Sequence, residues 1–203
     1  MRKWAFHGLL ALVLASLLLM TSCGSFLDGS EESKSHSTQK KDPNSPPETE
    51  EMIQIYKEAK AVYEYMMVSH FPLRTSESSV IIEGMDYYRV EFDDIETMTD
   101  LKKYLKKYFS DLIIDEMLNQ DIKRYREIDG ALYGLNGDRG LNPVMGEEQF
   151  AYNESSDTKV RLEVMVEILG EDDSETAISY ESYFFVYEKL EGKWVFTDFP
   201  YFR

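Results

Sequence analysis

In the first part of the folded region, apolar residues recur every three or four positions, which places them on one face of a helix. This pattern predicts a helix over residues 52–68, followed by Pro72. A second helix is expected after Thr97, because Thr97 and Asp100 have the spacing of a capping box. Ser110 is expected to cap a third, short helix. The apolar faces of the first two helices consist of Met52, Ile55, Tyr56, Ala59, Val62, Tyr63 and Met66, and of Leu101, Tyr104, Leu105 and Tyr108.

The second half of the chain changes to a period of two, the period of a strand with one buried face. Residues 159–169 alternate most clearly, and Asp129-Gly130 is a strong signal for a hairpin turn. Helices followed by a meander of antiparallel strands predict an α+β domain, with the N-terminal helices packed on a curved antiparallel β-sheet. The other expected strands cover residues 80–92 (with a turn near 84–86), 125–128, 131–135, 176–190 and 193–198.

The first 22 residues have the three parts of a secretory signal. Arg2 and Lys3 supply positive charge, residues 9–20 are apolar, and two small residues precede Cys23. The apolar run is shorter than the about 20 residues that a membrane-spanning helix needs. Residues 19–24 resemble the lipobox of bacterial lipoproteins, whose cysteine carries fatty acyl chains such as palmitate. We therefore predict a cleaved signal peptide (1–22) and a lipid anchor on Cys23 at the outer, extracytoplasmic face of the cell membrane; an ordinary signal peptide with a chance cysteine is the alternative.

Residues 23–51 differ in composition from the rest of the chain. Ser, Glu, Lys, Asp and Pro dominate, and after Cys23 the only large apolar residues are Phe26 and Leu27. Such a segment cannot offset the entropy cost of folding, so we expect a disordered linker that reaches roughly 90 Å when extended. Because Cys23 is the only cysteine, no internal disulfide can form. Residues 52–203 are therefore expected to be a single domain that is held together by its core.

Acidic residues outnumber basic residues along the mature chain. The whole sequence has 22 Lys and Arg against 38 Asp and Glu, a formal net charge of −16 at pH 7. Residues 52–203 have 17 basic and 31 acidic residues, a net charge of −14. A domain with this charge repels polyphosphates, so we expect no nucleic-acid partner. Basic proteins or cations are favoured as partners, and solubility alone is the alternative explanation of the charge.

The predicted domain has few residues suited to catalysis or to metal binding. His70 is its only histidine and precedes Phe71-Pro72 in a turn, whereas Ser-His-Asp and Cys-His sites need a histidine held beside a nucleophile. A zinc site would need carboxylates that zinc does not prefer as a full set. We expect a protein that is not an enzyme, with no catalytic residue, no metal and no cofactor. A hydrolase with a pair of carboxylates stays open as an alternative.

Two loops are candidates for the recognition of a partner. Residues 134–143 form a long glycine-rich loop with apolar residues among polar ones, which suits binding, although simple connection is the alternative. The acidic turn 171–175 joins two long strands and lacks the spacing of an EF-hand loop, so it is either a solvated hairpin tip or a calcium site. The residues expected to contact a partner are Asn136, Asp138, Arg139, Leu141, Asp172 and Asp173.

Lysines form a single basic cluster in the predicted domain. They lie opposite the apolar face of the second helix, so the simplest interpretation is a solvated helix face. Contact with anionic lipid or with a wall polymer is the alternative. The cluster consists of Lys102, Lys103, Lys106 and Lys107.

Several aromatic runs follow one another in a characteristic order along the chain. They are Tyr87-Tyr88-Arg89-Val90, Phe92-Asp93, Leu101-Lys102-Lys103-Tyr104-Leu105, Tyr108-Phe109, Tyr125 with Ile128-Asp129-Gly130-Ala131-Leu132-Tyr133, and Gly192-Lys193-Trp194-Val195-Phe196. Over residues 51–203 this order resembles the bacterial DL-endopeptidase inhibitor family of the IseA type. The resemblance implies an α+β domain that binds and blocks NlpC/P60-type cysteine endopeptidases, which cleave peptidoglycan. The alternative is an NTF2-like or cystatin-like lipoprotein that binds a small ligand or another envelope protein, because Gly-Lys-Trp hairpins also end such domains.

Overall fold

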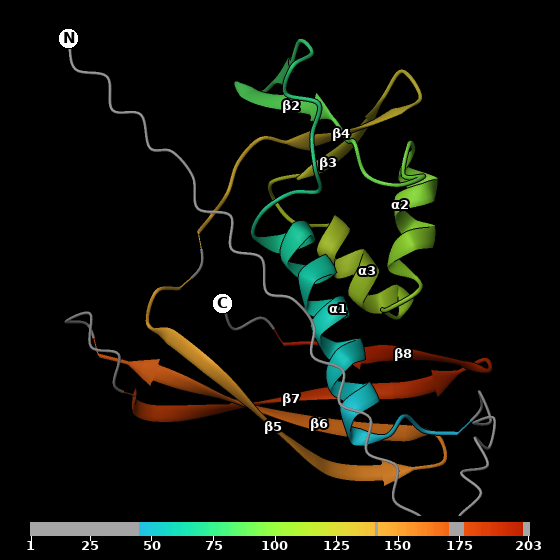
Figure 1. Cartoon of the computed structure of the whole chain (residues 1–203). Helices are drawn as coiled ribbons and strands as arrows, with labels where there is room; N and C mark the ends of the chain where they lie inside the picture. The colour runs from blue at the N-terminus through green and yellow to red at the C-terminus, as the bar shows by residue number, and fades with distance from the viewer. Residues whose placement is uncertain (1–44, 141, 171–176, 201–203) are drawn as a thin grey trace, which may run out of the picture. The chain divides into compact units, whose positions relative to one another are not determined.

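The computed structural model describes residues 45–140, 142–170 and 177–200, which form three helices and eight strands (Figure 1). The helices are α1 (Thr49–Met67), α2 (Met98–Leu105) and α3 (Asp111–Leu118). The strands are β1 (Val80–Ile82), β2 (Met85–Arg89), β3 (Tyr125–Ile128), β4 (Ala131–Leu135), β5 (Met145–Ser156), β6 (Lys159–Leu169), β7 (Ala177–Leu190) and β8 (Lys193–Asp198). The predicted signal peptide, Cys23 and most of the predicted linker lie outside the described residues.

The described strands form two antiparallel sheets. The small sheet has the order β1-β2-β4-β3, and the large sheet runs β5-β6-β7-β8 in chain order. In Figure 1 the three helices lie between the small sheet at the top and the large, curved sheet at the bottom. The predicted α+β class and the packing of the helices on a curved antiparallel sheet are confirmed. The separate small sheet is an additional finding: the short strands on either side of α2 and α3 pair with one another instead of joining the meander.

Capping explains where the first two helices begin. α1 starts at Thr49, earlier than the predicted residue 52, because Glu48 caps it and donates its backbone N–H to Glu51 Oε2 at 3.4 Å. The capping box predicted for α2 is confirmed. Thr97 N–H donates to Asp100 Oδ2 at 3.0 Å, and Asp100 N–H donates to Thr97 Oγ1 at 3.1 Å. These reciprocal bonds satisfy backbone donors that the first turn of a helix leaves unpaired.

Turn geometry and strand alternation also follow the sequence. Asp129 and Gly130 have φ values of 50° and 77°, the left-handed pair of a type I′ turn that suits the twist of a hairpin. Every second residue of β6 from Val160 to Val166 is fully buried, which confirms the predicted core-facing side of this strand. The predicted cap of α3 is confirmed only in its position: Ser110 precedes the helix, but its hydroxyl makes no capping hydrogen bond.

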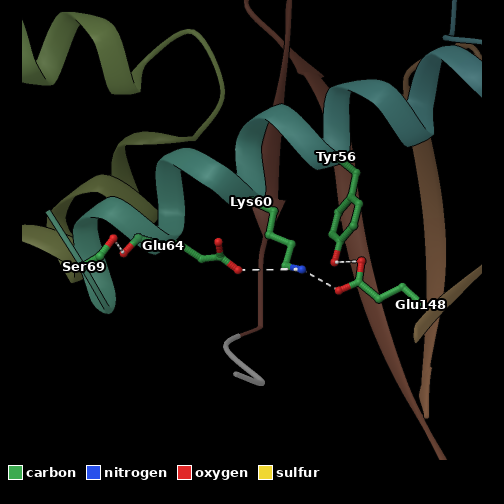
Figure 2. Close-up of polar contacts among 5 residues, drawn as sticks. All are labelled: Tyr56, Lys60, Glu64, Ser69 and Glu148. Atoms are coloured by element: carbon green, nitrogen blue, oxygen red, sulfur yellow. Dashed lines mark hydrogen bonds and ion pairs between the residues drawn. The ribbon is translucent and has the colours of Figure 1, made fainter. Parts of the chain in front are cut away.

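β5 is an edge strand of the large sheet that the sequence pattern does not predict. Its core-facing residues include Glu148 beside Phe150 and Tyr152, so a charged residue breaks the apolar alternation. Figure 2 shows Glu148 between two side chains of α1: Lys60 Nζ lies 2.5 Å from Glu148 Oε1, and Tyr56 OH lies 3.5 Å from Glu148 Oε2. The paired charge attaches α1 to β5, and an inward charge on an edge strand also discourages pairing with another chain.

Aromatic rings fill the space between the helices and the large sheet. Tyr56 of α1, Phe109 of the α2–α3 connection, Phe185 of β7 and Phe196 of β8 are at most 1% exposed. Phe199 lies among them, with ring centroids 4.8 Å from Phe185, 4.9 Å from Phe196 and 5.3 Å from Phe109, all in edge-to-face arrangement. Such pairs add to the hydrophobic stabilisation of the core, on which a domain without disulfides depends.

Candidate functional site

The predicted recognition loop connects β4 of the small sheet with β5 of the large sheet (Figure 1). The structure describes residues 136–140 and 142–144 of this connection, whereas Leu141 lies outside the described residues. Asn136, Asp138 and Arg139, three of the predicted partner-binding residues, are all exposed. The loop therefore presents an amide, a carboxylate and a guanidinium group to the solvent.

Arg124, the residue before β3, holds the first part of this loop. Only 7% of Arg124 is exposed. Its Nη2 donates to the carbonyl oxygens of Val68 at 2.5 Å, Ser69 at 2.6 Å and Gly137 at 2.6 Å, and its Nε donates to Ser69 O at 3.0 Å. Val68 and Ser69 follow the end of α1, where carbonyl groups and the helix dipole favour a cation. Burial lowers the pKa of Arg124 from its ordinary value, yet a guanidinium stays charged in proteins. One buried cation thus joins the loop to the end of the first helix.

The middle of the loop is shaped by backbone hydrogen bonds. Arg139 N–H donates to Val68 O at 3.0 Å, next to the contact that Val68 makes with Arg124. Gly140 N–H donates to Asp138 Oδ1 at 2.7 Å, the bond of an Asx turn. Gly140 has a φ of 72°, which a residue with a side chain adopts at an energetic cost. The turn orients the Asp138 carboxylate and holds the backbone of Arg139 against the end of α1.

The end of the loop lies beside the end of β6. Val144 N–H donates to Asn142 Oδ1 at 3.3 Å, and Val144 O accepts from Leu169 N–H at 2.7 Å. Leu169 is the last residue of β6, and the predicted contact residues Asp172 and Asp173 follow it, outside the described residues. The residue before β5 is therefore hydrogen-bonded to the last residue of β6, although the two are far apart in sequence.

The structure places His70, the one histidine of the predicted domain, next to the end of α1. His70 Nδ1 lies 2.9 Å from the carbonyl oxygen of Phe71, a contact with the backbone. Across residues 45–140, 142–170 and 177–200, no group of three or more His, Cys, Asp or Glu is arranged to hold a metal ion. In the same ranges, no helix combines the length and the apolar character needed to cross a membrane.

Sequence reasoning did not identify Arg124 as a residue of this site. The sequence shows only that Arg124 directly precedes the predicted strand 125–128. It does not distinguish Arg124 from Lys123 and Arg126, the basic residues on either side of it in the same run. Arg126 instead points to the surface, where its Nη2 lies 3.1 Å from Glu83 Oε2. The tertiary structure places Arg124 beside the end of α1, where it donates to Val68 O and Ser69 O, whereas Lys123 donates to Leu118 O at the end of α3.

Comparison with known proteins identifies the family of the chain. A family model described as IseA DL-endopeptidase inhibitor matches residues 48–200. No curated protein matches the sequence. The matched region begins at the cap of α1 and includes all the described helices and strands, so it spans both sheets and the β4–β5 loop. It also includes every aromatic run that carries the resemblance noted from the sequence. The chain belongs to the IseA DL-endopeptidase inhibitor family.

Proposed function

We propose that this protein is a lipid-anchored inhibitor of NlpC/P60-type DL-endopeptidases that acts by protein–protein binding outside the membrane. The family match over residues 48–200 is the observation that carries this proposal. An inhibitor of this kind needs a surface that fits the enzyme and no catalytic group of its own. The exposed charges and amides of the β4–β5 loop supply such a surface.

In this proposal the β4–β5 loop and the acidic turn 171–175 make the main contact with the enzyme. Asp138 and Arg139 are exposed in the loop, while Arg124 and Val144 hold its two ends. A loop whose ends are already held loses less conformational entropy on binding than a free segment does. The same fixation supports binding of the enzyme by a preformed surface.

The charge of the domain supports rapid association with a basic enzyme. Residues 52–203 carry a net charge of −14. An acidic inhibitor is attracted by a basic hydrolase and repelled by the anionic polymers of the wall. Dissolved salt screens both interactions, and the screening distance (the Debye length) is about 8 Å at physiological ionic strength. The steering component of inhibition is therefore expected to decrease as salt is added.

The packing of the described core supports inhibition over the alternative of a small-ligand carrier. A carrier of the NTF2-like or cystatin-like kind needs an apolar pocket between helices and sheet. Between α1 and the large sheet, fully buried side chains such as Tyr56, Phe185 and Phe196 pack against one another. The cavity of about 430 Å³ between α1, α3 and the end of β8 is not purely apolar, because Glu116, Gln120 and Asp198 are among the residues that line it.

The chain from Gly24 to Arg203 is expected to inhibit peptidoglycan digestion by NlpC/P60 endopeptidases of the same organism. This segment contains every described element and the whole core. Inhibition is measured at low and at physiological salt, and Asp172→Lys combined with Asp173→Lys is expected to weaken it because two attractive charges are reversed. Asp157→Lys combined with Glu58→Lys is the matched control, since it makes the same change of charge at exposed residues away from the loop. The absence of inhibition at micromolar concentrations against every such enzyme would contradict the proposal.

Cys23→Ala is expected to release the protein from the membrane fraction or to leave its precursor uncleaved. The prediction follows from the run of residues 19–24, in which acylation needs the Cys23 thiol. Cell fractionation and the apparent mass of the protein report the result. Unchanged processing and unchanged membrane association of the variant would show that Cys23 is not the anchor.

A further inference from the structure

Four lysines line a cavity of about 570 Å³ between the end of α2 and the start of β8. The cavity is lined by Lys103, Lys106, Lys107, Lys193, Trp194 and Val195. Three of the lysines come from α2 and the residues directly after it, and Lys193 opens β8. The fold thus adds a fifth lysine, Lys193, to the basic cluster of Lys102, Lys103, Lys106 and Lys107.

The positive character of this cavity stands out in a domain with a net charge of −14. No carboxylate is among the residues that line it. Carboxylates do lie around its rim: Lys106 Nζ is 2.8 Å from Asp111 Oδ1, and the charges of Asp115 and Glu191 also act on Lys106. The hydrogen bond from Lys106 to Asp111 raises the pKa of this lysine, so its positive charge is secure at neutral pH.

Trp194 lines the cavity, and the Tyr104 ring lies under one of its lysines. Lys107 Nζ lies 4.6 Å from the centre of the Tyr104 ring, a cation–π distance. Trp194 stacks on Tyr187 of β7 with ring centroids 5.5 Å apart and an angle of 17° between the ring planes. A half-buried tryptophan beside exposed lysines is a combination that suits the interface of a membrane with water.

We propose that this lysine cavity binds the phosphate ester of an anionic phospholipid head group. Clusters of four or more basic residues next to a membrane bind anionic lipids, with each lysine adding to the attraction. The proposal is independent of the inhibitor function, and it uses the predicted membrane anchor only as the reason why head groups are within reach.

The position of the cavity leaves the recognition loop accessible. In Figure 1, α2 and the end of the large sheet where β7 meets β8 lie on the right, whereas the β4–β5 connection runs down the left side. A domain that rests on the membrane through the lysine cavity therefore directs the β4–β5 loop away from the lipid contact. Outside the cavity the domain has more acidic than basic residues, so an anionic membrane repels the remainder and favours this orientation.

The test measures how residues 24–203, without acylation, bind to vesicles of phosphatidylcholine with and without phosphatidylglycerol. We expect binding only to the vesicles with phosphatidylglycerol, and we expect Lys107→Gln combined with Lys193→Gln to weaken it about tenfold or more. Lys57→Gln combined with Lys102→Gln is the matched control, because it removes the same charge from exposed lysines that do not line the cavity. Both double variants should inhibit endopeptidases equally well. A failure of the lipid-binding proposal can therefore be distinguished from a failure of the inhibitor proposal.

A second arm replaces the vesicles with soluble sn-glycerol 3-phosphate. Weak binding that shifts the NMR signal of the Trp194 indole N–H, together with stronger binding to the vesicles, supports a head-group site. Binding of the soluble ester without any binding to vesicles would overturn the lipid as the source of the phosphate. Equal loss of binding in the two double variants would overturn the cavity as the site, because it would show a response to net charge alone.

Discussion

Val164→Asp is expected to lower the free energy of unfolding by about 4 kcal/mol, a large part of the stability of a domain of this size. Val164 is fully buried in the middle of β6, between Phe150 of β5 and Tyr183 of β7. An aspartate there places a carboxylate among apolar side chains with no cation to pair with it. Thermal or urea unfolding of residues 24–203, followed by circular dichroism, measures the loss.

Arg161→Asp in the same strand is the matched control for this variant. Arg161 lies on the opposite face of β6, where its guanidinium is 4.1 Å from the centre of the Phe184 ring. The loss of this half-exposed cation–π contact is expected to cost about 1 kcal/mol. If both variants unfold at the same denaturant concentration, the two faces of the large sheet have been assigned wrongly.

Arg124→Met is expected to weaken inhibition about tenfold and to cost about 3 kcal/mol of stability. Methionine keeps much of the length of the side chain but removes the guanidinium N–H groups that donate to the carbonyl oxygens of Val68, Ser69 and Gly137. These carbonyl groups then lose their charged partner, and the first part of the β4–β5 loop is no longer tied to the end of α1. The measurements are inhibition at a temperature where the variant stays folded, and hydrogen exchange of the Arg139 amide, which donates to Val68 O.

Arg126→Met makes the same chemical change two residues away. Arg126 pairs with the exposed Glu83 and donates to the hydroxyl of the buried Tyr87. An exposed ion pair contributes at most about 1 kcal/mol, and neither contact holds the loop. Its effects on inhibition and on the exchange of the Arg139 amide should therefore be small. If both variants weaken inhibition equally, inhibition depends on the positive charge of the arginines and not on the attachment of the loop to α1.

Local sequence was enough to predict most of the elements. The alternation in residues 159–169 and the signal at Asp129-Gly130 depend on neighbours in the chain, and both appear in the structure where expected. The capping box of Thr97 and Asp100 is local in the same sense. These features are decided within a few residues, so a single sequence is sufficient to predict them.

β5 is the strand that local reasoning could not find. Its core-facing residue Glu148 is polar, and its place inside the sheet depends on Lys60 and Tyr56, which lie far away in the chain. The pairing partner that makes the segment a strand is β6, whose apolar face supplies the burial. When a strand is stabilised by partners that are distant in sequence, the alternation of apolar and polar residues in its own sequence is weak.

The α+β class, the acidic charge and the family resemblance could be predicted from the sequence alone. What holds the β4–β5 loop depends on the packing of distant elements. Arg124 is one of several basic residues in its run, and it anchors the loop because the carbonyl groups of Val68 and Ser69, just after α1, lie beside it. Lys193 likewise joined the lysines of α2 through the pairing of β8 with β7. Hydrogen-bond donors and charges find their partners through space, and the positions of these partners are set only when the distant elements pack together.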